Sequence, residues 1–134
     1  MVTFVNGKPS KDDYRRFRIR GVDKIDDYQM LKEVLERRYG RVIRENLKKP
    51  DLILIDGGKG HLSVACKSLQ GLGIEIPIIA IAKEEELIYT VSNNSPLRLT
   101  KDNQALKLIQ HIRDEAHRFA VKYHRLLRTK NTFE

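Results

Sequence analysis

The sequence has little that would place it in a membrane or in an oxidising compartment. Its 134 residues include one cysteine, Cys66, so no disulfide bond can form within the chain. No apolar run approaches the roughly 20 residues that a membrane-spanning helix requires. Met1–Val5 is a short β-type run and lacks the basic stretch and apolar helix of a signal peptide. These absences predict a cytoplasmic protein in which Cys66 is reduced and packed in the core on one face of a helix.

Acidic residues are fewer than basic ones, which leaves a formal net charge of +8 and a pI near 9.7. Residues 1–50 carry 14 Lys and Arg against 8 Asp and Glu, and residues 101–134 carry 8 against 4. The middle of the chain carries 4 against 6. A basic beginning and end around a slightly acidic centre would suit a nuclease with catalytic carboxylates and a cationic DNA track. The alternative is a soluble protein with many solvated lysines.

The spacing of apolar residues predicts an α/β fold of one domain or most of one. Asn6-Gly7 favours a hairpin between two N-terminal strands, and Asp26-Asp27 favours the start of a helix that Gly40 would end. Two buried strands around a helix that begins near His61 indicate a parallel βαβ unit. The predicted strands are Met1–Val5, Tyr14–Arg20, Asp51–Asp56, Pro77–Ala82, Leu87–Val91 and Leu97–Thr100, and the last helix is Asn103–Leu127.

The predicted strand Tyr14–Arg20 has one uniformly basic face. Period-two alternation places Arg16, Arg18 and Arg20 on that face. These arginines are candidate DNA contacts. The alternative is a charged, exposed strand that discourages edge-to-edge pairing.

Asp56 is the first candidate for chemistry, because it ends a buried parallel strand at the sheet edge where α/β proteins bind ligands. The glycines after it would let a phosphate or metal approach the backbone, so Asp56 is a candidate metal ligand. The alternative is an aspartate that caps the turn. The run Gly57–Gly60 lacks the spacing of a nucleotide-binding P-loop, and Lys59 within it either meets a backbone phosphate or is simply solvated.

His117 is the second candidate, as a metal ligand or general base on the last helix. Asp114 precedes it by three residues and could orient its ring, whereas the alternative is a solvated surface histidine. The Asp26-Asp27 pair either caps a helix or contributes one ligand to a metal site. His61, His111 and His124 are interpreted as structural or surface residues.

Three segments together resemble the signature stretches of the UvrC family: 51–60, 113–120, and Asp26-Asp27-Tyr28 leading to Arg37-Arg38-Tyr39-Gly40. The resemblance covers nearly the whole chain from Met1 to about Arg128. It implies an RNase H-like mixed sheet flanked by helices and a metal-dependent cut, with Mg²⁺ or Mn²⁺, on the 5′ side of a lesion in nucleotide-excision repair. It also implies that Asp56 and His117 are catalytic and that Asp26 or Asp27 contributes to the site.

The resemblance further implies that damaged DNA and UvrB are partners, and that the protein is bacterial and cytoplasmic. The expected DNA contacts are Arg16, Arg18, Arg20, Lys59, Arg113 and Arg118. The family's first catalytic aspartate, on the central first strand of the sheet, and its UvrB-binding segment have no counterpart here. We therefore expect a truncated endonuclease domain over residues 1–128, a disordered tail over 129–134, and an inactive or nearly inactive fragment. The alternatives are a non-catalytic basic DNA-binding module and a gene fragment with no separate function.

Overall fold

The structure is a computed structural model that describes residues 1–16, 27–83 and 85–133. The side chains of Asn94, His124 and residues 127–133 lie outside the description. The chain divides into two compact units. The terminal unit consists of Met1–Arg18 and Thr100–Glu134, and the sheet unit of Ile19–Leu99. No helix in the described parts of the chain is long and apolar enough to cross a membrane.

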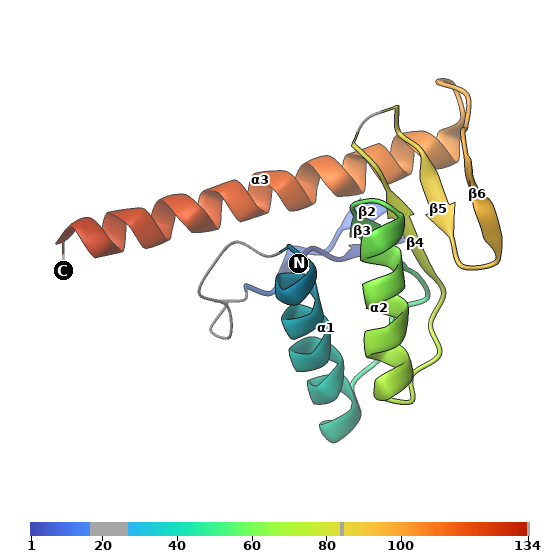
Figure 1. Cartoon of the computed structure of the whole chain (residues 1–134). Helices are drawn as coiled ribbons and strands as arrows, with labels where there is room; N and C mark the ends of the chain where they lie inside the picture. The colour runs from blue at the N-terminus through green and yellow to red at the C-terminus, as the bar shows by residue number, and fades with distance from the viewer. Residues whose placement is uncertain (17–26, 84, 134) are drawn as a thin grey trace. The chain divides into compact units, whose positions relative to one another are not determined.

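The sheet unit contains a four-stranded mixed sheet in the order β3-β4-β5-β6 (Figure 1). Its strands are β3 (Ile53–Asp56), β4 (Ile78–Ile81), β5 (Ile88–Thr90) and β6 (Asn93–Leu97). β3 and β4 are parallel, and the two following pairs are antiparallel. The predicted α/β class and the parallel βαβ unit are therefore confirmed. The predicted strand Leu97–Thr100 was wrong, because β6 runs from Asn93 to Leu97 and the turn after β5 lies at Val91-Ser92.

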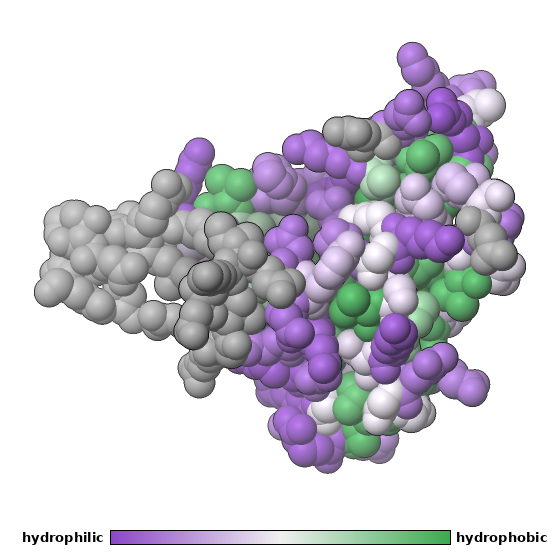
Figure 2. Space-filling model, in the orientation of Figure 1, coloured by the Kyte–Doolittle hydropathy of each residue, from purple (hydrophilic) through white to green (hydrophobic). Residues whose placement is uncertain are grey.

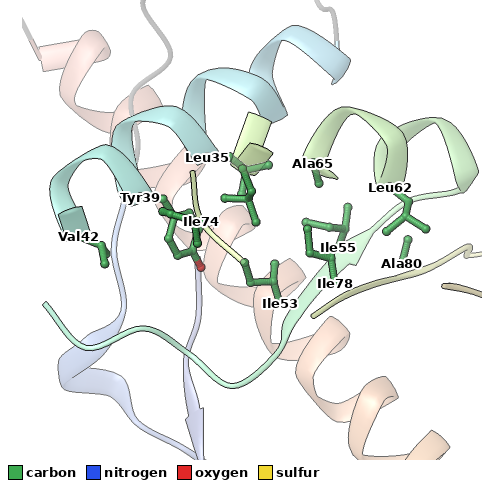
Figure 3. Close-up of a cluster of buried hydrophobic side chains, with 11 residues drawn as sticks. Leu35, Tyr39, Val42, Ile53, Ile55, Leu62, Ala65, Ile74, Ile78 and Ala80 are labelled. Atoms are coloured by element: carbon green, nitrogen blue, oxygen red, sulfur yellow. The ribbon is translucent and has the colours of Figure 1, made fainter. Parts of the chain in front are cut away.

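Two helices, α1 (Asp27–Arg44) and α2 (Lys59–Gly71), pack against each other, and α2 packs against β3 and β4. Their apolar residues recur in steps of three and four, which puts them on one helical face. The resulting core consists of Leu35, Tyr39, Val42, Ile53, Ile55, Leu62, Ala65, Leu69, Ile74, Ile78 and Ala80 (Figure 3). Cys66 packs against this core as predicted, and burial raises the pKa of its thiol.

The prediction that Gly40 ends the first helix was wrong. Gly40 is buried inside α1, and the apolar stripe continues past it to Val42, which is 1% exposed. The burial gained at Val42 outweighs the modest helix-breaking tendency of one glycine. The helix ends at Arg44, shortly before Asn46 adopts a left-handed conformation at φ 51°.

The outward face of α1 is hydrophilic. Figure 2 shows hydrophilic residues, in purple, gathered over the part of the surface where α1 lies. Three ion pairs connect residues four positions apart on this face: Lys32–Glu36, Glu33–Arg37 and Arg41–Glu45. Each such pair stabilises a helix by a few tenths of a kcal/mol, about 0.2–0.5. Several basic residues of α1 are thus matched by acidic neighbours, which weakens the case for this face as a DNA-binding surface.

The terminal unit contains a small hairpin, a 3₁₀ turn and a long helix, α3 (Gln104–Phe133). β1 (Phe4–Val5) pairs with β2 (Lys8–Pro9), which takes the place of the predicted hairpin partner Tyr14–Arg20. The reason is the Asn6-Gly7 turn, predicted correctly: both residues have positive φ, at 53° and 80°, and reverse the chain within two residues. Residues 14–16 form no strand, and residues 17–20 of that prediction lie outside the described residues. α3 continues beyond the predicted end at Leu127, and the division at residue 128 stays a prediction.

Candidate functional site

Asp56 lies at the carboxyl end of β3, opposite Ile81 at the end of the parallel strand β4. This is the sheet edge that the sequence predicts. The aspartate is exposed, and its carboxylate has no hydrogen bond or ion pair with any described residue. β3 therefore presents a fixed negative charge to the solvent at a position where α/β sheets bind ligands.

The four residues after Asp56, Gly57–Gly60, form a connection that we call the glycine loop. The Gly57 N–H donates a hydrogen bond to the carbonyl of Ile81 over 3.0 Å, and the Gly58 N–H donates to Nδ1 of His61 over 3.3 Å. α2 begins at Lys59, whose side chain is exposed. The loop thus joins the end of β3 to the start of α2 with two of its amides already bonded.

Two of the glycines are required by close packing. A Cβ atom on Gly57 would lie 2.5 Å from Cγ of His61, and a Cβ atom on Gly60 would lie 2.2 Å from the hydroxyl oxygen of Tyr28. Real Cβ contacts are essentially never so short, so a larger residue at either position would move a ring.

The first turn of α1 lies beside this loop. Tyr28 contacts His61 edge to face, with ring centroids 4.7 Å apart and an interplanar angle of 67°. The contact brings Asp27, the exposed first residue of α1, to the same end of the sheet unit as Asp56. Asp26 lies outside the described residues, so the choice between the two acids stays a prediction.

Asp56 has the donor chemistry of a Mg²⁺ or Mn²⁺ ligand, because both ions prefer carboxylate oxygens. Among the described residues, no group of three or more His, Cys, Asp or Glu side chains could hold a metal ion. Mg²⁺ commonly keeps several waters and takes only one or two protein carboxylates. Asp56 therefore fits such an ion, and the remaining donors must come from water, from phosphate or from beyond the described residues.

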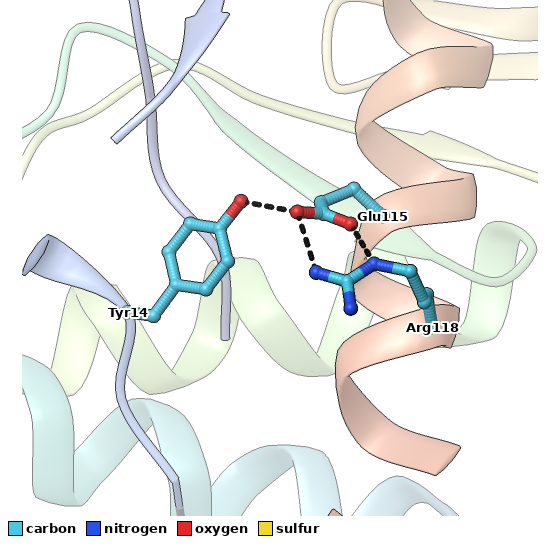
Figure 4. A network of polar contacts seen from close by, with 3 residues as sticks. All are labelled: Tyr14, Glu115 and Arg118. Carbon is cyan, nitrogen blue, oxygen red and sulfur yellow. Dashed lines mark hydrogen bonds and ion pairs between the residues drawn. The ribbon is translucent and has the colours of Figure 1, made fainter. Parts of the chain in front are cut away.

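The second group of candidate site residues lies on α3 in the terminal unit, apart in the sequence from Asp56 and the glycine loop. Tyr14 donates a hydrogen bond to Oε2 of Glu115 over 2.7 Å, and Arg118 donates to both carboxylate oxygens over 2.5 and 3.0 Å (Figure 4). The Arg118 hydrogen bond, followed by that from Tyr14, lowers the pKa of Glu115 to about 2. Burial, followed by the hydrogen bond to Glu115, raises the pKa of Tyr14 to about 12. The network fixes the N-terminal segment to α3.

This network has consequences for the predicted DNA contacts. Arg118 is held by Glu115, which neutralises its charge, and the guanidinium of Arg16 lies over the ring of Phe119 at 5.3 Å from its centroid. Arg113 is 17% exposed and pairs with Asp114 over 3.4 Å. Arg18 and Arg20 lie outside the described residues. All of these residues, with Lys59, stay predicted contacts.

His117 is exposed on α3 and has no hydrogen bond or ion pair among the described contacts. The predicted contact with Asp114 is absent there, since Asp114 pairs with Arg113 instead. His117 belongs to the terminal unit and Asp56 to the sheet unit, so their pairing at one catalytic centre stays a prediction.

The sequence did not lead us to the residues that support the glycine loop and the part of α3 around Glu115. His61 stands three residues after Gly58, the spacing at which a side chain caps the start of a helix, and that signal could have been used. Tyr14 and Glu115 are 101 positions apart, and nothing local in the sequence links them.

The Glu115 network predicts an acid sensitivity. The pKa of Glu115 is about 2 in the folded chain and 4.5 ordinarily, so its stabilisation is complete above pH 4.5 and is lost between about pH 4.5 and 2. At neutral pH, Glu115→Gln should lower the free energy of unfolding by about 1–2 kcal/mol. In urea titrations this deficit should shrink as the pH falls from 6 to 3.

The matched control is Glu75→Gln, which changes an exposed glutamate of the sheet unit that has no ion pair among the described contacts. It should leave the unfolding free energy almost unchanged across the same range. A Glu115→Gln deficit that stays constant with pH would contradict the assignment.

Comparison with known proteins gives a consistent match. The family described as UvrC RNAse H endonuclease domain matches residues 1–121. A protein of Methanococcus maripaludis named UvrABC system protein C is 55% identical over 130 residues, which are 97% of this chain and 25% of that protein. The protein of the same name from Prosthecochloris aestuarii is 52% identical over 134 residues, 100% of this chain and 22% of its own length. The chain thus spans about a quarter of these relatives.

Proposed function

Because this chain belongs to the UvrC RNase H endonuclease domain family, we propose that it carries part of the active site for DNA strand incision in nucleotide-excision repair. The substrate is damaged DNA, and the cut falls on the 5′ side of the lesion. The observation that carries the proposal is the placement of Asp56: exposed, without a described protein partner, at the carboxyl end of β3 and followed by the glycine loop.

In this proposal Asp56 holds a divalent ion, Mg²⁺ or Mn²⁺. Such an ion, when bound, lowers the pKa of a water molecule and offsets charge that develops on the phosphate. Asp56 is suited to hold it because the sheet fixes its backbone through the register with Ile81. The absence of side chains at Gly57 and Gly58 lets a phosphate approach the backbone closely.

Lys59 is the proposed phosphate contact of the sheet unit. It is exposed and is the first residue of α2, where the positive end of the helix dipole also favours an anion. Its ammonium group acts as a point charge on a non-bridging oxygen. The expected loss on Lys59→Ala is therefore in DNA affinity and its salt dependence.

His117 is proposed as a metal ligand or as the general base. It follows Glu115 by two residues on α3, so the bonds from Tyr14 and Arg118 fix the helical turn that carries it. Arg113 and Arg16 are the proposed DNA contacts of this unit within the described residues. Because Glu115 offsets its charge, Arg118 should contribute less to DNA binding than an unpaired arginine would.

We also propose that the 134 residues alone incise DNA weakly or not at all. The described residues provide one well-placed carboxylate and no group of three potential ligands. The remaining ligand would come from outside the described residues, and UvrB is a proposed partner of the protein.

A strand-nicking assay tests the proposal. This chain is compared with a chimera in which it replaces the matching quarter of the Methanococcus maripaludis UvrABC system protein C. The chimera should nick lesion-containing duplex DNA 5′ of the lesion with Mg²⁺ or Mn²⁺ and the repair partners present, and not with a chelator. Robust nicking by the chain alone would overturn the weak-activity proposal. A chimera that binds DNA with steep salt dependence but never cuts would favour a non-catalytic binding module instead.

A further inference from the structure

Three observations place the His61 side chain against the glycine loop. Its Nδ1 accepts the Gly58 N–H over 3.3 Å, and its ring meets Tyr28 with centroids 4.7 Å apart. Its Cγ also lies 2.5 Å from the position that a Cβ atom on Gly57 would occupy. One partly buried side chain therefore touches the loop directly and connects it to α1.

The position of His61 explains the hydrogen bond. Gly58 immediately precedes α2, and His61 is the third residue of the helix. At this spacing a glutamate or glutamine side chain commonly accepts the N–H of the residue that precedes the helix, as one half of a capping box. His61 performs the same task with a ring nitrogen, which must carry no proton to accept the bond.

We propose that His61, held in place by Tyr28, is a positioning residue that fixes the glycine loop and thereby the directions of Asp56 and Lys59. This inference rests on the proposed function of that loop. Glycine is the most conformationally free residue, and three of the four loop residues are glycines. The loop is held at Gly57 by the carbonyl of Ile81, at Gly58 by His61 and at Gly60 by contact with Tyr28. Without the hydrogen bond between Gly58 and His61, the side chains of Asp56 and Lys59 on either side of it lose their fixed geometry.

Two substitutions separate the hydrogen bond from the ring contact. His61→Gln keeps an acceptor at the capping position and removes the ring, whereas His61→Phe keeps a ring and removes the acceptor. The control is His111→Phe in the terminal unit. His111 also meets a ring edge to face, with its centroid 5.0 Å from that of Phe4, and its side chain accepts no described backbone N–H.

The first measurement is the hydrogen-exchange rate of the Gly58 amide in the whole 134-residue chain. His61→Phe should speed this exchange roughly threefold to tenfold, the range expected for one lost hydrogen bond. His61→Gln and His111→Phe should leave it near the unsubstituted rate. An unchanged rate in His61→Phe, or an equal increase in His61→Gln, would overturn the inference.

The second measurement is a titration with Mn²⁺ alone, followed by the broadening of the Gly57 and Gly58 amide resonances. His61→Phe should need severalfold more Mn²⁺ than the unsubstituted chain for the same broadening. His61→Gln should need about as much Mn²⁺ as the unsubstituted chain. Both variants could bind Mn²⁺ normally while the Gly58 amide of His61→Phe exchanges faster. In that case His61 fixes the loop without positioning Asp56, and the proposed positioning role is wrong. If Mn²⁺ never broadens these amides in the unsubstituted chain, the proposed metal site fails, while the exchange rates still decide whether His61 fixes the loop.

A third variant approaches the same loop from the other side. Gly60→Ala places a methyl group against the Tyr28 hydroxyl and should displace that ring from His61. It should therefore speed Gly58 exchange as His61→Phe does. Gly71→Ala is the matched control in the same helix, because a Cβ atom there meets no other atom within 4 Å. Equal exchange in the two alanine variants would count against Tyr28 as the support of His61.

Discussion

Asp56→Asn should reduce metal-dependent nicking by the chimera roughly a thousandfold. The substitution keeps the size of the side chain and removes its negative charge, so the loop should retain its shape while the metal is held weakly. Charge stabilisation by a bound metal is worth several kcal/mol, and each 1.4 kcal/mol, approximately, changes a rate tenfold. The measurement is the initial rate of strand nicking at saturating Mg²⁺, with the thermal unfolding temperature recorded for the same samples.

Asp51→Asn is the control for this prediction. Asp51 is also exposed and precedes β3, so it flanks the same strand from the end opposite to Asp56. It should nick at close to the unsubstituted rate. Equal losses in the two variants would point to a general charge effect on DNA binding, and full activity in Asp56→Asn would remove Asp56 from the site. An Asp27→Asn variant tested alongside would show whether the first turn of α1 contributes.

The central part of the fold could be predicted because its signals are local and agree with one another. The continuous apolar run that ends at Asp56 indicates a strand buried on both faces, and the glycine loop after it permits a tight connection to a helix. Two such strands around one helix leave few alternatives to a parallel pair. These local signals alone predict Asp56 at the carboxyl end of the strand, where the structure has it.

The errors share a physical cause, which is that tertiary packing decided between local alternatives. Gly40 is a plausible helix end until Val42 is known to be buried in the core. Tyr14 suits a strand by composition, but the hairpin closes earlier at Asn6-Gly7, and Tyr14 is used to bond Glu115. The contact between Tyr28 and His61 is likewise a meeting of two helices that no spacing rule reveals.

Leu69→Ala should destabilise the chain more than any other single change considered above. Leu69 lies near the end of α2, is 2% exposed and packs in the core. Truncation of a buried leucine costs about 2–5 kcal/mol, because apolar contacts are lost and a cavity remains. Total stability is typically about 5–15 kcal/mol, so a large share of it would be lost. Urea titration should show a lower midpoint with a similar slope.

Leu52→Ala provides the control, since Leu52 precedes β3 in the same unit and is 49% exposed. Its truncation should change the unfolding free energy by less than about 1 kcal/mol. The comparison also bears on the site, because α2 carries the glycine loop at its start and Leu69 near its end. If Leu69→Ala lowers the unfolding free energy no more than Leu52→Ala does, this core does not anchor α2. The sheet unit would then not hold Asp56 in a fixed direction through α2.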